Sequence, residues 1–567
     1  MTSLPIVDRE LRVACRRPSY FRARIWVGLA VMALAGILFG MHALSSRGGG
    51  GAGVSLGRML FEVFKWLSFL AASFSGVILT ADCLSEEKRE GTLGLLFLTD
   101  LRGYDVVLGK VAIHALQSVY AFLAAFPVVG TCFILGGVTG TEFFRIIVLL
   151  LATLFLSLSI GVLVSACNRE TARTMTITLA IQLFLLLGLP ALDQLVGGPP
   201  LGNGIGWLIH FNPAYAIWQA SAIQPFQFYN PILCLVGLAT TCLAASSLIA
   251  PRTWQSTASR RKDSPDLSIS TDPTHRPPLR IQRRPILDRD PVEWLAQRLY
   301  RPGWLIWITT LITFVGLAIA YATRKPSPTP GMPAIHATSQ IVALVLAAFI
   351  RLWLALQACR FWTDARASGA MELLLVTPLQ PRQIIRGQWR ALCRAFIPIV
   401  LVLALITAGV AYVQMLAVLN LNRASMLSSA ATLGSSLSEA DIDRMLADSR
   451  SQMLVSMGFS VISQFSSFWA IAWMGMWMGM NTRRIQTAVG KTLIFADFLP
   501  VVGATLLQLL LSLAIWGWGR TFFTAMVLVP AVALAVDLIL AWIARRRAYA
   551  RFPAFVSAST GESLGGS

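Results

Sequence analysis

Long apolar segments alternate with short polar ones along almost the whole chain, and this pattern determines the class of fold. The apolar segments run for about 18 to 25 residues, which is the length that an α-helix needs to cross a bilayer. Six lie in the first half of the chain: 25–44, 59–80, 111–135, 143–166, 174–192 and 231–250. Six more lie in the second half: 303–322, 338–359, 391–414, 455–480, 492–515 and 521–544. The sequence therefore predicts an all-α polytopic membrane protein with about twelve transmembrane helices.

A short cassette occurs twice, each time directly after a long apolar segment. The first cassette spans 81–110 and the second spans 360–388. At one constant offset an acidic residue, a basic residue, a Gly, a Leu-Leu pair, a Thr and a closing Gly coincide in the two copies. Together with the equal number of apolar segments, this match predicts a six-plus-six tandem duplication.

The charge distribution predicts the orientation of the chain in the membrane. The net charge is +20, and Lys and Arg gather before the first apolar segment, in residues 251–284 and after the last segment. Residues 191–230 contain no Lys or Arg. By the positive-inside rule, both termini and both cassettes then lie on the cytoplasmic side of the cytoplasmic (inner) membrane. This distribution favours topology and attraction to anionic lipid headgroups over nucleic-acid binding.

Each cassette predicts a helical hairpin on the cytoplasmic surface, with a Gly that permits a sharp bend and a short apolar helix after it. The residues of the first hairpin are Glu86, Gly91, Thr92, Leu93, Leu96, Phe97 and Thr99. Those of the second are Asp364, Gly369, Met371, Leu374, Leu375 and Thr377. We expect Leu93, Leu96 and Phe97, with their counterparts, to form the face that receives force from a soluble partner. The alternative is that the hairpin is only a structured turn.

The first cassette resembles the ABC type-2 permease family, the membrane subunits of ABC exporters. The resemblance rests on Glu86-x-Lys88-x-x-Gly91-Thr92-Leu93 and on Leu96, Thr99, Leu101 and Gly109-Lys110. It implies a coupling helix between the second and third spans of each half, docked on a separate ABC ATPase subunit in two copies. ATP and Mg²⁺ would be bound by that partner, and this chain would bind no cofactor.

With this resemblance the chain divides into two permease halves. Residues 1–250 form the first half, 285–551 the second, and 552–567 a C-terminal tail. Residues 251–284 are rich in Pro, Ser, Thr, Asp and Arg, so they predict a flexible basic cytoplasmic linker. The insertion 415–454 contains a capping box at its Ser438, which predicts a short amphipathic helix outside the membrane. That helix either covers the neighbouring spans or docks an extracytoplasmic protein partner.

The segment Trp207 to Trp218 predicts a second feature on the outer side. It is apolar but broken at Asn212-Pro213, and it resembles the re-entrant extracytoplasmic segment of the family. An aromatic belt at the membrane interface explains its aromatic residues equally well.

The chain itself shows no pattern for catalysis, for a metal or for ATP binding. Gly490-Lys491-Thr492 has the ending of a P-loop, but Ile485 occupies the position of the first Gly. No Ser, His and acid grouping or metal-ligand spacing occurs either. We therefore expect a permease subunit that is not an enzyme and has no nucleotide-binding domain.

Burying an ionisable side chain within an apolar segment costs free energy unless the side chain has a polar partner. Arg351 and Asp537 lie at similar distances from the cytoplasmic ends of their segments, so they are one candidate ion pair. Asp497, with Lys491, is a rival or additional set. A structural ion pair and a substrate or proton pathway both remain open.

These observations predict ATP-driven movement of a substrate, by family resemblance an export, across the membrane. The alternative is a non-transporting membrane component that relays force from an ATPase to an envelope protein through residues 415–454. The lipid bilayer is a partner in both cases.

Overall fold

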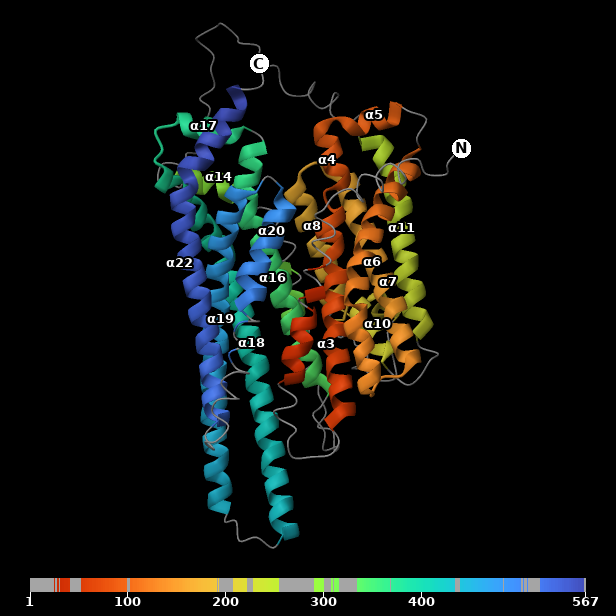
Figure 1. The fold of residues 1–567 in the computed structure, drawn as a ribbon, viewed down its shortest axis with the longest axis vertical. Helices are drawn as coiled ribbons and strands as arrows, with labels where there is room; N and C mark the ends of the chain where they lie inside the picture. Colours follow the sequence, from red (N-terminus) through yellow and green to blue (C-terminus); the bar gives the residue numbers. More distant parts are fainter. Residues whose placement is uncertain are drawn as a thin grey trace. The chain divides into compact units, whose positions relative to one another are not determined.

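The computed structural model describes most of the chain as helices (Figure 1). The described residues are 52–98, 102–190, 207–221, 228–253, 290–299, 334–367, 369–433, 439–482, 484–500 and 521–564, with short pieces at 25, 28–29, 31–40, 192, 307–308, 310–315, 503 and 507. No strand occurs in this part of the chain. The predicted class, an all-α polytopic membrane protein, is confirmed.

Among the described residues, seven helices are long and apolar enough to cross a membrane. They are Leu56–Glu90, Gly103–Leu123, Gly140–Cys167, Tyr229–Thr253, Val342–Arg366, Pro381–Leu427 and Ile442–Asn481. Each overlaps one of the predicted segments. Two further predicted segments correspond to shorter apolar helices, Val31–Gly40 and Arg173–Gly188. The total of twelve stays a prediction, because parts of the remaining segments lie outside the described residues.

The chain separates into two compact units. The first comprises Met1–Met32, Gly53–Pro190 and Ile205–Leu295, and the second comprises Ala33–Ala52, Ala191–Gly204 and Ala296–Ser567. Residues 254–284 of the predicted linker lie outside the described residues. The predicted boundaries of the permease halves therefore stay a prediction.

The first unit is organised around one long central helix, α7 (Gly140–Cys167), which packs against α11, α6, α8, α10 and η1. Its other elements are α3 (Ala52–Ser75), η1 (Gly76–Thr80), α4 (Cys83–Glu90), α5 (Thr92–Leu98), α6 (Gly103–Leu135), α8 (Thr171–Leu183), η2 (Phe184–Gly188), η3 (Trp207–Phe211), α10 (Pro213–Ala220) and α11 (Tyr229–Thr253). α14 (Pro291–Leu299) follows in the sequence.

The contact between η1 and α7 is unusually close because both elements present small residues. A Cβ atom on Gly76 would lie 1.9 Å from the Ser157 carbonyl oxygen, and one on Gly161 would lie 2.6 Å from the Gly76 carbonyl oxygen. η1 is a π-turn, which interrupts the regular hydrogen bonds of a helix. The Ser157 hydroxyl compensates, since it accepts from the Gly76 N–H at 2.9 Å and donates to the Ser73 carbonyl at 2.8 Å.

The predicted break at Asn212-Pro213 is the point where η3 ends and α10 begins. The Asn212 Oδ1 caps α10 by accepting from the backbone N–H groups of Ala214 and Tyr215, at 2.7 and 3.2 Å. Its Nδ2 donates to the Leu186 carbonyl at 2.9 Å, within η2. One buried side chain therefore caps α10 and holds it against η2.

The second unit is dominated by four long helices. They are α16 (Ala334–Ala367), α18 (Pro381–Leu433), α19 (Glu439–Asn481) and α22 (Thr521–Leu564). The described residues of this unit also form α17 (Ala370–Val376), α20 (Ile485–Leu493) and η6 (Ile494–Phe498). α19 packs against all of the other three long helices. α22 continues to Leu564, so most of the predicted C-terminal tail is helical.

α18 and α19 are far longer than a membrane crossing requires. They contain 53 and 43 residues, so at 1.5 Å per residue they extend about 80 and 65 Å, against about 30 Å of hydrocarbon. Both run on together beyond the other helices of this unit (Figure 1). The insertion 415–454 is therefore not a short separate helix, as predicted, but the paired ends of two spans. A capping box marks where a helix begins and carries no information on where it ends.

Candidate functional site

The two cassettes fold into the same hairpin. In the first, α4 ends at Gly91, α5 follows as a seven-residue helix, and α6 begins at Gly103. In the second, α16 leads to Gly369, α17 follows as another seven-residue helix, and α18 begins at Pro381. The bounds of α17 and the start of α18 match those of α5 and α6 at the constant offset found in the sequence. The repeated residues thus encode a repeated backbone.

Gly91 and Gly369 make this hairpin possible. Their φ angles are +74° and +68°, in the left-handed region that residues with a Cβ avoid. A Cβ atom at either position would meet no heavy atom within 4 Å. Both positions therefore favour glycine because of its backbone conformation, and not because a larger side chain would lack space.

A basic residue anchors each hairpin to the end of a neighbouring span. The Lys88 Nζ donates to the carbonyl of Ala166, the penultimate residue of α7. At the equivalent position, the Arg366 Nη2 donates at 2.7 Å to the carbonyl of Met480, the penultimate residue of α19. The last carbonyls of a helix have no partner within the helix, so each cation satisfies one of them. The sequence showed that a basic residue recurs at this position of the cassette, but the carbonyl that it binds depends on the tertiary fold.

Further contacts bind the first hairpin to the body of its unit. The Ser165 Oγ accepts from the backbone N–H groups of Leu84 and Ser85, at 3.0 and 2.9 Å. Glu87 forms a 2.7 Å ion pair with Lys110 of α6. The hairpin is therefore attached to α6 as well as to α7.

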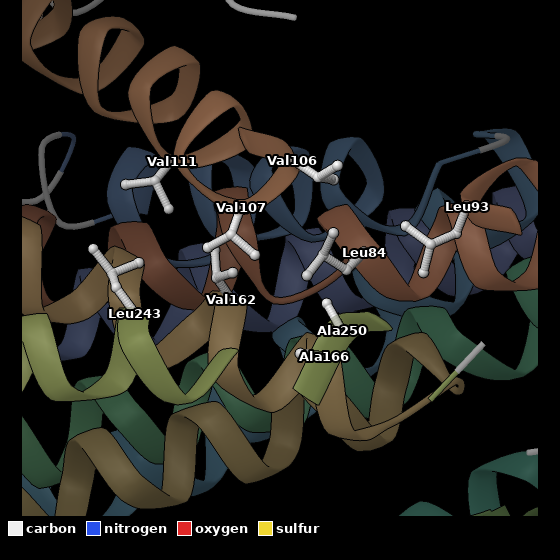
Figure 2. Packing of buried hydrophobic residues seen from close by; sticks show 9 residues of the cluster. All are labelled: Leu84, Leu93, Val106, Val107, Val111, Val162, Ala166, Leu243 and Ala250. Carbon is white, nitrogen blue, oxygen red and sulfur yellow. The ribbon is translucent and has the colours of Figure 1, made fainter. Parts of the chain in front are cut away.

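Part of the face of α5 that we predicted to dock on a partner is instead packed against the rest of the first unit. Leu93 is buried in a cluster with Leu84, Val106 and Val162, and Figure 2 shows it beside Leu84. Leu96 and Phe97 pack partly against the same cluster. In the second hairpin Met371 is buried and Leu374 is half-buried. The Leu375 side chain lies outside the described residues.

The exposed side of each short helix carries a different apolar pair. In α5, Leu95 and Leu98 are 64% and 77% exposed, and at the equivalent positions of α17, Leu373 and Val376 are 74% and 86% exposed. Sequence reasoning missed these pairs because both sides of a nearly all-apolar helix look alike. The signal that could have found them is the recurrence of an apolar residue at these two positions, spaced i,i+3, in both copies.

The other predicted residues of the cassettes have local roles. Asp364 pairs with Arg360 at 3.0 Å, and the Thr92 Oγ1 donates to the Glu87 carbonyl at 3.4 Å. The Thr377 Oγ1 donates to the Leu374 carbonyl. Glu86 is exposed in the first turn of α4. Thr99 lies outside the described residues.

The candidate ion pair Arg351–Asp537 is replaced by another pairing. The Arg351 Nη1 lies 2.7 Å from the Oδ1 of Asp497, in the π-turn η6. The Oδ2 of Asp537 instead accepts from the hydroxyls of Ser466 and Ser467, at 2.9 and 3.0 Å. Equal depth along two helices does not decide which faces meet, and the helix rotation that packing imposes brings the rival, Asp497, to Arg351.

No group of three or more His, Cys, Asp or Glu residues that could hold a metal ion occurs among the described residues.

Comparison with known proteins identifies part of the first unit. Residues 67–244 match the family model of the ABC-2 family transporter protein. The matched stretch contains the whole first cassette and continues through α7 into α11. No curated protein matches the chain.

Proposed function

We propose that this chain, which matches the ABC-2 family transporter model over residues 67–244 and has several helices able to cross a membrane, is a permease component of an ABC transporter. It exports a substrate using ATP hydrolysed by a separate subunit. Both units take part in the translocation of the substrate. ATP and Mg²⁺ bind to the partner, and this chain is not itself an enzyme. The membrane is the cytoplasmic one, with both termini inside, as the Lys and Arg distribution indicates.

The exposed apolar pairs carry this proposal. Leu95 with Leu98, and Leu373 with Val376, expose large apolar side chains on short helices whose opposite sides bury Leu93 and Met371. Contact with a protein partner would remove this surface from water, which favours binding. Two such helices, at equivalent places in the two halves, suit a dimer of ABC ATPase subunits.

The anchoring of the hairpins supports a mechanical role. Lys88 near the end of α4 and Arg366 near the end of α16 attach the segment before each glycine to the end of α7 and of α19. A displacement of the hairpin that reaches these segments would therefore be transmitted to α7 and α19. Each glycine lets its short helix turn away from the preceding helix, while the cation just before the glycine holds that preceding helix against a neighbouring span. ATPase closure would therefore move whole spans instead of flexing a loop.

The long α18–α19 pair favours a second candidate function. Its outer part exposes apolar residues such as Leu427 and Met445. At 1.5 Å per residue Leu427 lies about 69 Å along α18 from its start at Pro381, more than twice the roughly 30 Å of a hydrocarbon core. In this alternative the chain moves no solute, and the helix pair relays ATPase motion to an extracytoplasmic protein.

The test is a pair of charge substitutions with one matched control. Leu98→Glu and Val376→Glu should each insert normally but lose copurification with the ATPase, because an unpaired carboxylate is costly in an apolar contact. Leu427→Glu, the same kind of change on the outer part of the α18–α19 pair, should leave copurification intact. If Leu98→Glu and Val376→Glu both retain the ATPase and transport, the docking role of these helices is refuted. If Leu427→Glu abolishes function while the ATPase stays bound, the relay candidate is favoured.

A further inference from the structure

An apolar hollow opens on the first unit among α3, α6 and α7. Its volume is about 240 Å³. Four phenylalanines from the three helices, Phe61, Phe64, Phe122 and Phe143, line it together with Leu150 and other aliphatic side chains. Such a lining excludes water and suits hydrocarbon.

The hollow lies in the outer half of the membrane in the proposed orientation. Its α7 residues fall between Phe143 and Leu151, within about 17 Å of the helix start at 1.5 Å per residue. The hydrocarbon core is about 30 Å thick. An acyl chain of the outer leaflet is therefore at the right depth to enter.

A compact group of charges lies on the outer side of the hollow. Arg58 bridges Glu62 at 3.0 Å and Glu142 at 2.9 Å, and Lys65 contacts the same Glu62 at 2.5 Å. Lys65 is only 3% exposed and lines the hollow, while Arg58 and Glu62 remain partly open to the surroundings. The group holds two cations and two carboxylates, so its formal charges balance.

We propose that this site binds a phospholipid with a zwitterionic, ammonium-bearing headgroup, one acyl chain entering the hollow. Arg58 uses two of its five N–H donors on the carboxylates, which leaves donors for a phosphodiester. Glu62 offers acceptor positions to the ammonium group. Because the protein charges already balance, a headgroup with no net charge disturbs them less than an anionic one.

Lipid binding here would also reach the outer segment of the unit. The Lys65 Nζ donates at 3.0 Å to the hydroxyl of Ser221, the residue that ends α10. The headgroup site and α10 therefore share one buried lysine. A lipid that reorients Glu62 or Lys65 would change how α10 is held.

The experiment uses the full chain in nanodiscs with a phosphatidylethanolamine that carries a photoactivatable acyl chain. Cross-links mapped by mass spectrometry should fall on residues of the hollow. Ser68→Phe, which fills the hollow, should reduce the cross-links at least tenfold, and Arg58→Gln should reduce them several-fold. Leu67→Phe is the matched control, since Leu67 is adjacent but does not line the hollow, and it should leave them unchanged.

Three results would overturn the proposal. The first is an equal change in the cross-linking yield of Ser68→Phe and of its control Leu67→Phe. The second is a phosphatidylglycerol probe that labels the hollow as strongly as the ethanolamine probe. The third is a high-yield disulfide between cysteines placed at Leu151 and in residues 25–44 of the parent chain, because the first predicted span would then occupy the site.

Discussion

Replacing Gly91 or Gly369 with alanine isolates the energy of the bend in each hairpin. Both residues have positive φ, and an added Cβ would touch nothing within 4 Å. The cost is therefore that of a left-handed backbone alone, about 1–2 kcal/mol. A change of this size shifts the balance between the native hairpin and other conformations by a factor of roughly 5–30.

Asparagine tolerates the left-handed region better than alanine, so Gly91→Asn and Gly369→Asn should recover much of the loss. Gly130→Ala and Gly409→Ala are controls, since these glycines lie inside helices and also face open space. There alanine should be neutral or stabilising by about 0.5–1 kcal/mol.

The assays are thermal unfolding of the purified protein and copurification of the ATPase. We expect Gly91→Ala and Gly369→Ala to melt at lower temperature and to bind less ATPase, with asparagine between them and the parent. The reasoning is refuted if alanine equals the parent at both positions, or if asparagine is no better than alanine.

Three more perturbations test contacts that the structure assigns. In a double-mutant cycle of thermal unfolding, Arg351→Gln and Asp497→Asn should show a coupling of about 0.5–3 kcal/mol, and strict additivity would remove this ion pair. Lys88→Met and Arg366→Met should each cost about 1–3 kcal/mol by removing a hydrogen bond from a charged donor to a helix-end carbonyl, and they should uncouple ATP hydrolysis from transport; unchanged coupling in both would argue against the anchor. Gly161→Ala should force η1 and α7 apart at a cost of about 1–3 kcal/mol, whereas a melting temperature equal to the parent's would show that the contact is looser than described.

The intramembrane ion pairs show that a sequence can indicate the depth of a residue in the membrane but not its partner. Position within an apolar segment placed Arg351, Asp497 and Asp537 inside the membrane. Their pairing depends on helix rotation and on the π-turn that contains Asp497, and neither has a signature that we could recognise in one sequence.

The sequence by itself determined the class of fold, the sites of the two hairpins and the glycines at which they bend. These properties are local, since segment length, apolar periodicity and a left-handed glycine each depend on a few neighbouring residues. Only the tertiary structure decided which side of each short helix is exposed, because α5 is apolar on both sides and the packing of Leu93 against Leu84 selects one. It also decided that Lys88 and Arg366 bind the ends of α7 and α19, since these partners lie far away in the sequence and only the folded chain brings them together.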